Sequence, residues 1–343
     1  MNQISRKVSR TPSLTPQVVI VDGQHGCGKT MLSTIVAALD RVELLTYAYE
    51  VEYACALQFL NKMDFDAAVV LVRMFTDLKL YNVMMSREVN FRPKDLSSIF
   101  HNPHPIRYIK RLFEEGDRQI PRKIEQDNPI LHLTTHNLLS FSEPVFKGLR
   151  DRVTLIELVR HPLYMIKQQA QNMERLLNNV RYFTVNYQYN ETELPYYVRH
   201  FEDEFIKANN VEKAILCMHE LFKLSEQNKT RLKENYGAKI ITVPFERYVL
   251  DPDGYMDQIT TALGTSVTSL THRVMKKQKV PRAMYADGVD RKVYRRYEWK
   301  PPETASEESE FAMRRNFAKE KASDEAMAIL DQTCAEYEEK YLS

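Results

Sequence analysis

Residues 17–39 of this chain read QVVIVDGQHGCGKTMLSTIVAAL, and this stretch decides the fold. Gln17–Asp22 is a short run of mainly β-branched apolar residues, which is typical of a buried parallel strand. Gly23–Gly28 is a glycine-rich turn, and the apolar residues of Lys29–Leu39 recur at helical spacing. A strand, a glycine loop and a helix in this order predict the start of an α/β unit.

The glycine loop matches the pattern G-x-x-x-x-G-K-[ST] without a mismatch. Its residues are Gly23, Gln24, His25, Gly26, Cys27, Gly28, Lys29 and Thr30. Glycines let the backbone curl around a phosphate so that successive N–H groups point inward, and the next helix adds the positive end of its dipole. Lys29 would bring a mobile charge to the outer phosphate or sulfate oxygens, and Thr30 would donate a hydroxyl or bind Mg²⁺. The loop therefore predicts a phosphate-binding site.

Three further apolar runs predict strands, namely Pro129–Leu133, Val153–Val159 and Lys239–Pro244. Long stretches with helical spacing, around Leu163–Val180 and Val211–Glu234, separate them along the chain. Strands that alternate with helices predict a mainly parallel sheet covered on both faces. We expect a three-layer α/β fold like that of P-loop nucleoside triphosphatases, with helical insertions and a C-terminal helix.

Composition divides the chain into three parts. Residues 1–16 are polar and predict a flexible leader, and residues 17–300 predict one α/β domain with a helical and aromatic insertion at about 165–235. Residues 301–343 predict a linker followed by a helix. Pro301–Glu310 has the composition of a linker, and Ser323–Tyr341 has the spacing of an amphipathic helix.

The overall charge and the cysteines exclude several classes of protein. Because 48 Lys and Arg residues nearly balance 46 Asp and Glu residues, the net charge of +2 does not favour nucleic acid or an anionic membrane. We find no apolar run of the roughly 20 residues that a membrane span needs, and no signal peptide in residues 1–16. The widely spaced cysteines favour neither a disulfide framework nor a zinc site. We expect a cytoplasmic protein.

The glycine loop alone does not identify the reaction. Enzymes that use nucleoside triphosphates normally hold Mg²⁺ with a second carboxylate at the end of an apolar strand. Glu157 lies inside its predicted strand and Glu246 lies just beyond one, so neither is a clean match. This weakens the interpretation as a kinase or an ATPase, and we assign no metal ligand.

Four segments together resemble the sulfotransferases that use 3′-phosphoadenosine 5′-phosphosulfate (PAPS). They are the strand–loop–helix of residues 17–39, Leu133–Leu138, Val153–Gln169 and Val243–Gly264. In that family the first segment binds the 5′-phosphosulfate, the second carries a general-base histidine, the third holds the 3′-phosphate and the fourth closes the core. Their order along the chain agrees with the family.

The resemblance implies roles for individual residues. Arg160 would hold the 3′-phosphate, with Gln168 where the family has a serine, and His136 would take the proton of the acceptor. A surface salt bridge for Arg160 and a structural place at a strand end for His136 are the alternatives. Sulfotransferases usually have a lysine where this chain has Gly26, whereas Lys29 follows the last glycine as in a nucleotide kinase.

Three other features have both a functional and a structural interpretation. His25 either contacts the donor or, as we favour, faces solvent. Arg273–Lys300 holds ten basic residues, of which Arg291 and Lys292 are loosely similar to a family loop that folds over the 3′-phosphate. A solvated charged face is the close alternative, and nucleic-acid binding is a distant one. Tyr182–Phe201, with seven aromatic residues, is either an acceptor-binding lid or, as we favour, a packed insertion.

These features favour transfer of a sulfuryl group from PAPS to a hydroxyl or amine of an acceptor. In that mechanism the loop N–H groups, Lys29 and Thr30 stabilise the charge on the transferring group. One alternative is a kinase that uses ATP with Mg²⁺ on the same loop. Another is a regulatory protein that binds a nucleotide without turnover. The expected partners are a nucleotide donor and an unidentified acceptor.

Overall fold

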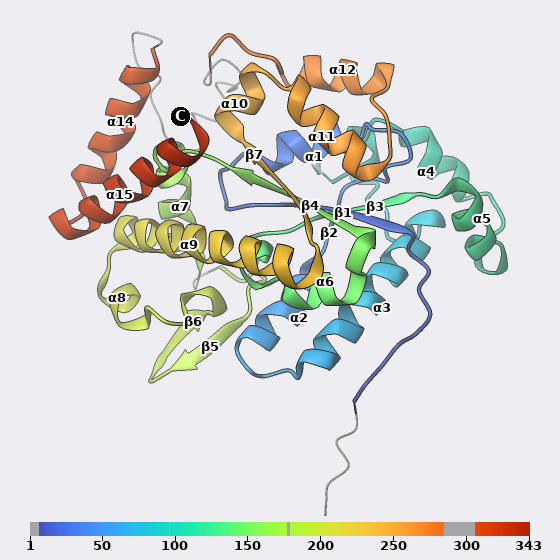
Figure 1. Cartoon of the computed structure of the whole chain (residues 1–343), viewed down its shortest axis with the longest axis horizontal. Coiled ribbons are helices and arrows are strands. Elements are labelled where there is room, and N and C mark those ends of the chain that lie inside the picture. Colours follow the sequence, from blue (N-terminus) through green and yellow to red (C-terminus); the bar gives the residue numbers. More distant parts are fainter. Residues whose placement is uncertain (1–6, 96, 177–178, 285–305) are drawn as a thin grey trace, which may run out of the picture.

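The computed structural model describes residues 7–95, 97–176, 179–284 and 306–343 (Figure 1). Its centre is a five-stranded sheet, of order β2-β3-β1-β4-β7, in which every neighbouring pair is parallel. These strands are β1 (Gln17–Asp22), β2 (Thr46–Tyr47), β3 (Ile130–Thr134), β4 (Val153–Val159) and β7 (Lys239–Pro244). The predicted parallel sheet is confirmed, and only the two-residue β2 is too short to give a sequence pattern.

Helices cover both faces of the sheet, so the molecule has three layers (Figure 1). One face packs against α1 (Lys29–Val36), α10 (Phe245–Leu250), α11 (Asp253–Leu263) and α12 (Ser269–Lys277). The other face packs against α2 (Tyr49–Phe59), α3 (Phe65–Met84), α5 (Ile120–Asp127) and α6 (Glu143–Leu149). The expected three-layer α/β fold is therefore present.

Four longer helices form a group beside β4 and β7. In this group α7 (Pro162–Leu176) packs against α9 (Asn210–Tyr236), and both contact α15 (Asp324–Tyr341). The fourth helix, α14 (Glu307–Lys319), packs on α7. The short helices α4 (Pro105–Arg111) and α8 (Glu202–Lys207) complete the set of α-helices in the described ranges.

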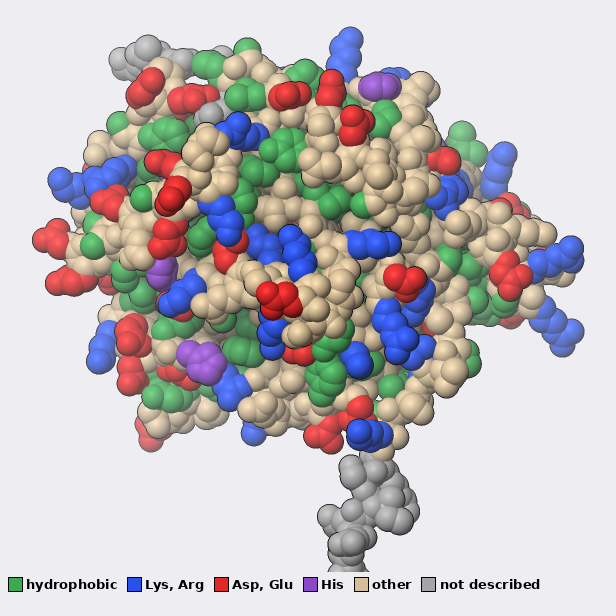
Figure 2. Space-filling model, viewed as in Figure 1, with side chains coloured by type: hydrophobic (Ala, Val, Ile, Leu, Met, Phe, Trp, Pro, Cys, Tyr) green, Lys and Arg blue, Asp and Glu red, His purple; other side chains and the backbone are tan. Residues whose placement is uncertain are grey.

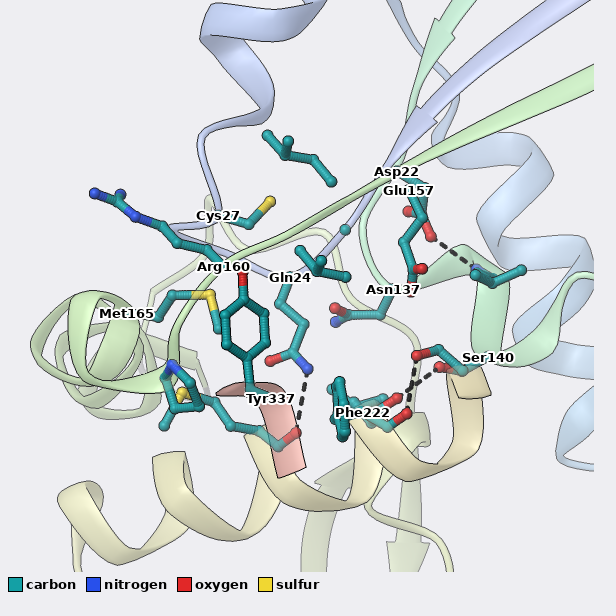
Figure 3. A pocket seen from close by; sticks show the side chains of 18 of the residues that line it. Asp22, Gln24, Cys27, Asn137, Ser140, Glu157, Arg160, Met165, Phe222 and Tyr337 are labelled. Atoms are coloured by element: carbon teal, nitrogen blue, oxygen red, sulfur yellow. Dashed lines mark hydrogen bonds between the residues drawn. The ribbon is translucent and has the colours of Figure 1, made fainter. Parts of the chain in front are cut away.

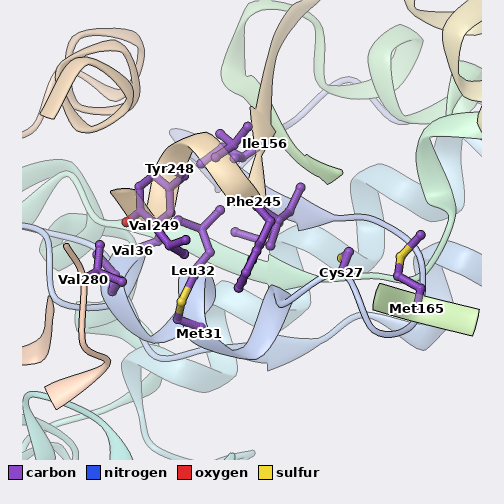
Figure 4. Packing of buried hydrophobic residues seen from close by; sticks show 14 of the residues in the cluster. Cys27, Met31, Leu32, Val36, Ile156, Met165, Phe245, Tyr248, Val249 and Val280 are labelled. Atoms are coloured by element: carbon purple, nitrogen blue, oxygen red, sulfur yellow. The ribbon is translucent and has the colours of Figure 1, made fainter. Parts of the chain in front are cut away.

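The core explains why β1 reads as an uninterrupted apolar run. Val19 and Val21 point to the α1 face, whereas Val18 and Ile20 point to the α2 face, and all four are fully buried. Burial of such a side chain contributes about 1.5–3 kcal/mol, so neither face of the strand tolerates a polar residue. Figure 4 shows the α1 side, where Leu32 packs with residues of α10.

The N-terminal segment differs from the expected flexible leader. The N–H groups of Leu14 and Thr15 donate to Asp77 Oδ1 of α3 at 3.0 and 2.9 Å, and Arg10 forms an ion pair with the same carboxylate at 3.0 Å. Val8 N–H donates to Asp66, also of α3. Residues 8–15 are therefore held along this helix by its acidic side chains.

Two other boundaries differ from the sequence predictions. The insertion at about 165–235 is not purely helical, because β5 (Asn186–Tyr189) and β6 (Thr192–Pro195) pair as an antiparallel hairpin. The predicted linker Pro301–Glu310 ends earlier than expected. Ser306 and Ser309 form a capping box that starts α14 within it, whereas residues 301–305 lie outside the described part. The predicted C-terminal helix is confirmed as α15.

The composition makes predictions about the charged side chains, the cysteines and the helices. Figure 2 shows positive and negative side chains intermixed across the visible face of the molecule. All four cysteines are free and buried. None of the helices in the described ranges combines the length and the apolar character needed to cross a membrane.

Candidate functional site

The predicted site residues lie at the carboxyl-end edge of the sheet. The register pairs Val21 of β1 with Thr134 of β3, and Asp22 with Glu157 of β4. Because parallel strands end at the same edge, the segments that follow β1, β3 and β4 come together there. This edge is where open α/β sheets bind ligands.

The glycine loop adopts a backbone that only glycine permits at two positions. Gly23 has φ 144°, and a Cβ there would lie 2.3 Å from the Leu158 carbonyl oxygen of β4. Gly28 has φ 103°, and its Cβ would lie 2.7 Å from the ring of Phe245. The loop is therefore pressed against β4 and α10, and both glycines are required for this close approach.

The start of α1 is open to an anion. Its first residue is Lys29, and the helix has neither a side-chain cap nor an acidic residue in its first turn. The first N–H groups of a helix lack intrahelical partners and carry the positive end of the dipole. An anionic group is the ligand that such a terminus favours.

Lys29 and Thr30 point in different directions. The Lys29 ammonium group is buried and donates to the Gly23 carbonyl oxygen, so it spans the loop. Thr30 is exposed and lines a separate hollow together with Tyr47 and His101. The structure thus brings Lys29, but not Thr30, next to the other predicted residues.

Arg160 lies directly behind the loop. Its Nη1 donates to the Gly26 carbonyl oxygen at 3.0 Å, and its guanidinium carbon lies 4.1 Å from the ring centre of Phe245 and 4.9 Å from that of Tyr164. Burial lowers the pKa of the guanidinium. Within the described ranges Arg160 makes no ion pair, and its role toward the 3′-phosphate stays a prediction. Gln168 also lies beside Gly26.

The basic segment reaches the site through Arg282. The guanidinium carbon of Arg282 lies 5.5 Å from the Phe245 ring centre, against which Arg160 also packs. Arg291 and Lys292 lie outside the described residues. Two positive groups therefore lie against the ring that also contacts Gly28.

His136 and His25 form a stacked pair. Their ring centres are 4.6 Å apart and the ring planes differ by 18°. Burial, His136 and Lys29 lower the pKa of His25, and burial lowers the pKa of His136 to about 3. Both rings are therefore neutral near pH 7. His25 is half-buried, and both rings line one cavity, so its contact with the donor or with solvent stays a prediction.

Glu52 of α2 and Asp22 of β1 are site residues that the motifs do not point to. Glu52 Oε1 accepts a hydrogen bond from the backbone N–H of His136 at 2.6 Å. Burial raises the pKa of Glu52 to about 8. Asp22 accepts hydrogen bonds from Thr135 and from the N–H groups that begin the next turn. Asp22 ends a predicted strand, which is a usable sequence signal, whereas nothing near Glu52 in the sequence indicates its role.

Two cavities meet at this edge. The loop cavity has a volume of about 40 Å³ and is lined by Gln24, Asn137 and Arg160, among others (Figure 3). Gln24 Oε1, Asn137 Oδ1 and Arg160 Nε are buried without a hydrogen-bond partner among the described residues. The histidine cavity, of about 210 Å³, is lined by His25, His136 and several aromatic residues. Asn137 borders both cavities.

The aromatic segment Tyr182–Phe201 is partly core and partly cavity wall. Tyr196, Tyr197 and Phe201 are buried in the hydrophobic core, as expected for a packed insertion, whereas Phe183 is largely exposed. Tyr182 lines the histidine cavity. Tyr196 and Tyr197 do so as well, so the segment also forms a wall of this cavity.

The carboxylates near the loop are engaged by protein groups. Glu157 Oε2 lies 2.8 Å from Lys229 Nζ, and Glu246 accepts from the Tyr337 hydroxyl and the His161 N–H. In the portion of the chain that is described, no three His, Cys, Asp or Glu side chains are arranged to hold a metal ion. Glu157 and Glu246, neither of which matched the pattern of an Mg²⁺ ligand in the sequence, are thus bound to protein groups.

Comparisons with known proteins give similarities at the level of structure. No family model and no curated protein matches the sequence. The structure is similar to the sulfotransferase domain of an olefin synthase from Synechococcus, with 14% identity over 92% of this chain and 98% of that chain and a TM-score of 0.41. It is also similar to the sulfotransferase domain from the curacin biosynthetic pathway, with 11% identity, 89% and 98% coverage and a TM-score of 0.42. A sulfotransferase from Mycobacterium avium is similar as well, with 13% identity over 96% of this chain and 78% of that chain and a TM-score of 0.39.

Proposed function

We propose that this protein transfers a sulfuryl group from PAPS to a hydroxyl or amine of an acceptor. The observation that carries the proposal is the junction of three elements at one edge. These are an uncapped helix N-terminus at Lys29, the Arg160 side chain, whose buried Nε has no partner among the described residues, and a neutral histidine that lines a second cavity. Anion binding, phosphate recognition and proton removal need these three groups.

The residues present fit an anionic donor. Arg160 Nε is buried without a partner in the described residues, and a guanidinium that loses water in this way favours a phosphate oxygen. The loop N–H groups and Lys29 would hold the 5′-phosphosulfate, and Arg160 with Gln168 would hold the 3′-phosphate. PAPS supplies an activated sulfuryl group, whose bond to the 5′-phosphate oxygen breaks as the bond to the acceptor forms. His136 would take the acceptor's proton.

The hydrogen bonds of the carboxylate nearest the loop favour sulfuryl transfer over phosphoryl transfer. Phosphoryl transfer on such a loop uses a carboxylate to hold Mg²⁺ beside the loop threonine. Here Asp22 Oδ1 accepts two hydrogen bonds and Oδ2 accepts one, and Thr30 faces another hollow. Both observations support a reaction that does not depend on Mg²⁺.

Isothermal titration with adenosine 3′,5′-bisphosphate (PAP), with ADP and with Mg·ATP tests the proposal. PAP should bind at least tenfold more tightly than ADP, which corresponds to about 1.4 kcal/mol for one set of charge-assisted contacts. Equal affinities for PAP and ADP would refute the proposal, and tight binding of Mg·ATP with phosphate transfer would identify a kinase. Tight PAP binding without turnover on any acceptor hydroxyl or amine would identify a regulatory nucleotide-binding protein.

A further inference from the structure

We propose that Glu52 is the positioning residue of His136. Its carboxylate accepts a hydrogen bond from Nδ1–H of the imidazole and thereby leaves Nε2 as the atom that takes the proton of the acceptor. This inference rests on the proposed function, in which His136 is the base. Neither the glycine-loop motif nor the sulfotransferase resemblance assigns a role to Glu52.

Two contacts join the side chains. The His136 N–H donates to Glu52 Oε1 at 2.6 Å, and the ring Nδ1 lies 3.3 Å from the same oxygen. The Glu52 side chain is only 12% exposed. A buried carboxylate oxygen that binds both the backbone and the ring of one residue fixes where that ring lies.

The fold explains why Glu52 reaches this position. Tyr47 of β2 pairs with Thr134 at the end of β3, and α2 begins at Tyr49, directly after β2. The first turn of α2 therefore lies beside the segment that follows β3 and contains His136. Glu52 is in this turn.

The surroundings restrict His136 to one orientation. His25 stacks on one face of the ring at 4.6 Å, and the rings of Tyr47 and Tyr49 lie nearly parallel to it at 6.4 Å. Nε2 makes no hydrogen bond with any residue that the structure describes, and His136 lines the histidine cavity. With Nδ1 directed to Glu52, Nε2 is the nitrogen left for an acceptor in the cavity.

The charge of Glu52 matters because a proton taken at Nε2 makes the imidazole a cation. An adjacent carboxylate stabilises that cation, whereas a protonated carboxyl group does not. Burial raises the pKa of Glu52 to about 8, so the carboxylate becomes fully available only above neutral pH. The other ionisable groups around the pair are Asp22, His25, Lys29, Tyr47, Glu50, Tyr49, Tyr53, Cys55 and Tyr196.

The test compares Glu52→Gln with Glu50→Gln. Gln keeps an oxygen for the His136 N–H but has no charge, so at pH 9, where Glu52 is ionised, kcat should fall about tenfold or more while PAP affinity stays within about twofold. Glu50 lies on the same helix and pairs with Lys79 at 2.9 Å, so its replacement should leave kcat unchanged. Wild-type kcat should rise with pH through an apparent pKa near 8 that Glu52→Gln removes.

A double-mutant cycle separates positioning from general destabilisation. In the His136→Ala background, Glu52→Gln should lower kcat no further, because the group that Glu52 positions is gone. If Glu52→Gln lowers kcat by the same factor in the wild-type and His136→Ala backgrounds, the proposal is refuted. An unchanged kcat in Glu52→Gln would refute it as well.

A measurement without substrate keeps the inference independent of the proposed function and of the folding of the variants. Long-range ¹H–¹⁵N correlation spectra of the wild-type protein at pH 9 should show the His136 proton on Nδ1. A proton on Nε2 would refute the positioning role even if the protein transfers sulfuryl groups. A proton on Nδ1 together with no PAPS turnover would leave this role standing and refute the proposed function alone.

Discussion

Arg160 Nη1 lies 3.0 Å from the carbonyl oxygen of Gly26, so the turn after β4 supports the glycine loop from behind. The same guanidinium packs on Phe245, whose ring contacts Gly28. A residue that the family resemblance assigns to the donor is therefore also part of the loop's support. Substitution of Arg160 should affect both donor affinity and loop stability.

Arg160→Ala should remove the preference for PAP over ADP, lowering PAP affinity about tenfold or more while ADP affinity changes less. The reason is that only PAP carries a 3′-phosphate. Titration calorimetry with both nucleotides measures the ratio. Arg315→Ala is the matched control, since Arg315 forms an exposed ion pair with Asp331 away from the loop. A ratio that stays the same in Arg160→Ala would place the 3′-phosphate elsewhere.

The strands and the loop could be predicted because their signals are local. Four apolar runs and the glycine pattern identified β1, β3, β4, β7 and the loop after β1. Glu52 could not be predicted, since its closeness to His136 depends on how β2 pairs with β3. The stacking of His25 on His136 could not be predicted for the same reason, because His136 follows a different strand.

Lys29→Ala and His136→Ala should have different effects. Lys29 offers a charge to the donor in both ground and transition states, so its loss should weaken PAP binding and lower kcat. His136 acts only as the acceptor's proton leaves, so its loss should lower kcat by roughly 10²–10⁴ with nearly unchanged PAP affinity. Titration and steady-state kinetics on both variants measure this difference.

Thermal unfolding of the same two variants provides the control. Lys29 also donates to Gly23, so part of its effect comes from a loosened loop. If His136→Ala folds normally and keeps full kcat, His136 is structural. The base would then be sought at His25, whose ring lies against it.

Divalent cations should not be required for activity. The nearby carboxylates of Asp22, Glu157 and Glu246 already accept hydrogen bonds from protein groups. Turnover of PAPS should therefore be the same after treatment with EDTA and after addition of Mg²⁺. Activity that EDTA abolishes and Mg²⁺ restores would instead indicate phosphoryl transfer.

Gly28→Ala should destabilise the fold by roughly 1–3 kcal/mol, because a Cβ at φ 103° is strained and would lie 2.7 Å from Phe245. Gly254→Ala is the control. Gly254 lies in α11 and has no neighbour within 4 Å of the added Cβ. Its replacement by Ala should therefore stabilise the fold by about 0.4–1 kcal/mol. Denaturant unfolding measures both, and equal stabilities of the two variants would mean that the loop adopts another backbone.

Lys229 belongs to a buried charge network beside the loop cavity, which Glu157 lines. Lys229 Nζ lies 2.8 Å from Glu157 Oε2 and also binds Glu226. Burial disfavours the charged form of Lys229, but the two carboxylates outweigh burial and raise its pKa. Lys229→Met would leave Glu157 buried without its counter-charge, which should destabilise the fold by about 3–5 kcal/mol.

A double variant and a surface variant distinguish this mechanism from loss of packing. Lys229→Met combined with Glu157→Gln removes both charges, so it should recover a large part of the lost stability. Lys340→Met also removes a partner of Glu226, but Lys340 is about half exposed, and its loss should change stability by no more than about 1 kcal/mol. Urea unfolding of the three variants provides the comparison. If the loss of unfolding free energy in the double variant equals the sum of the losses in the two single variants, Lys229 stabilises the interior by the packing of its side chain rather than by pairing with Glu157.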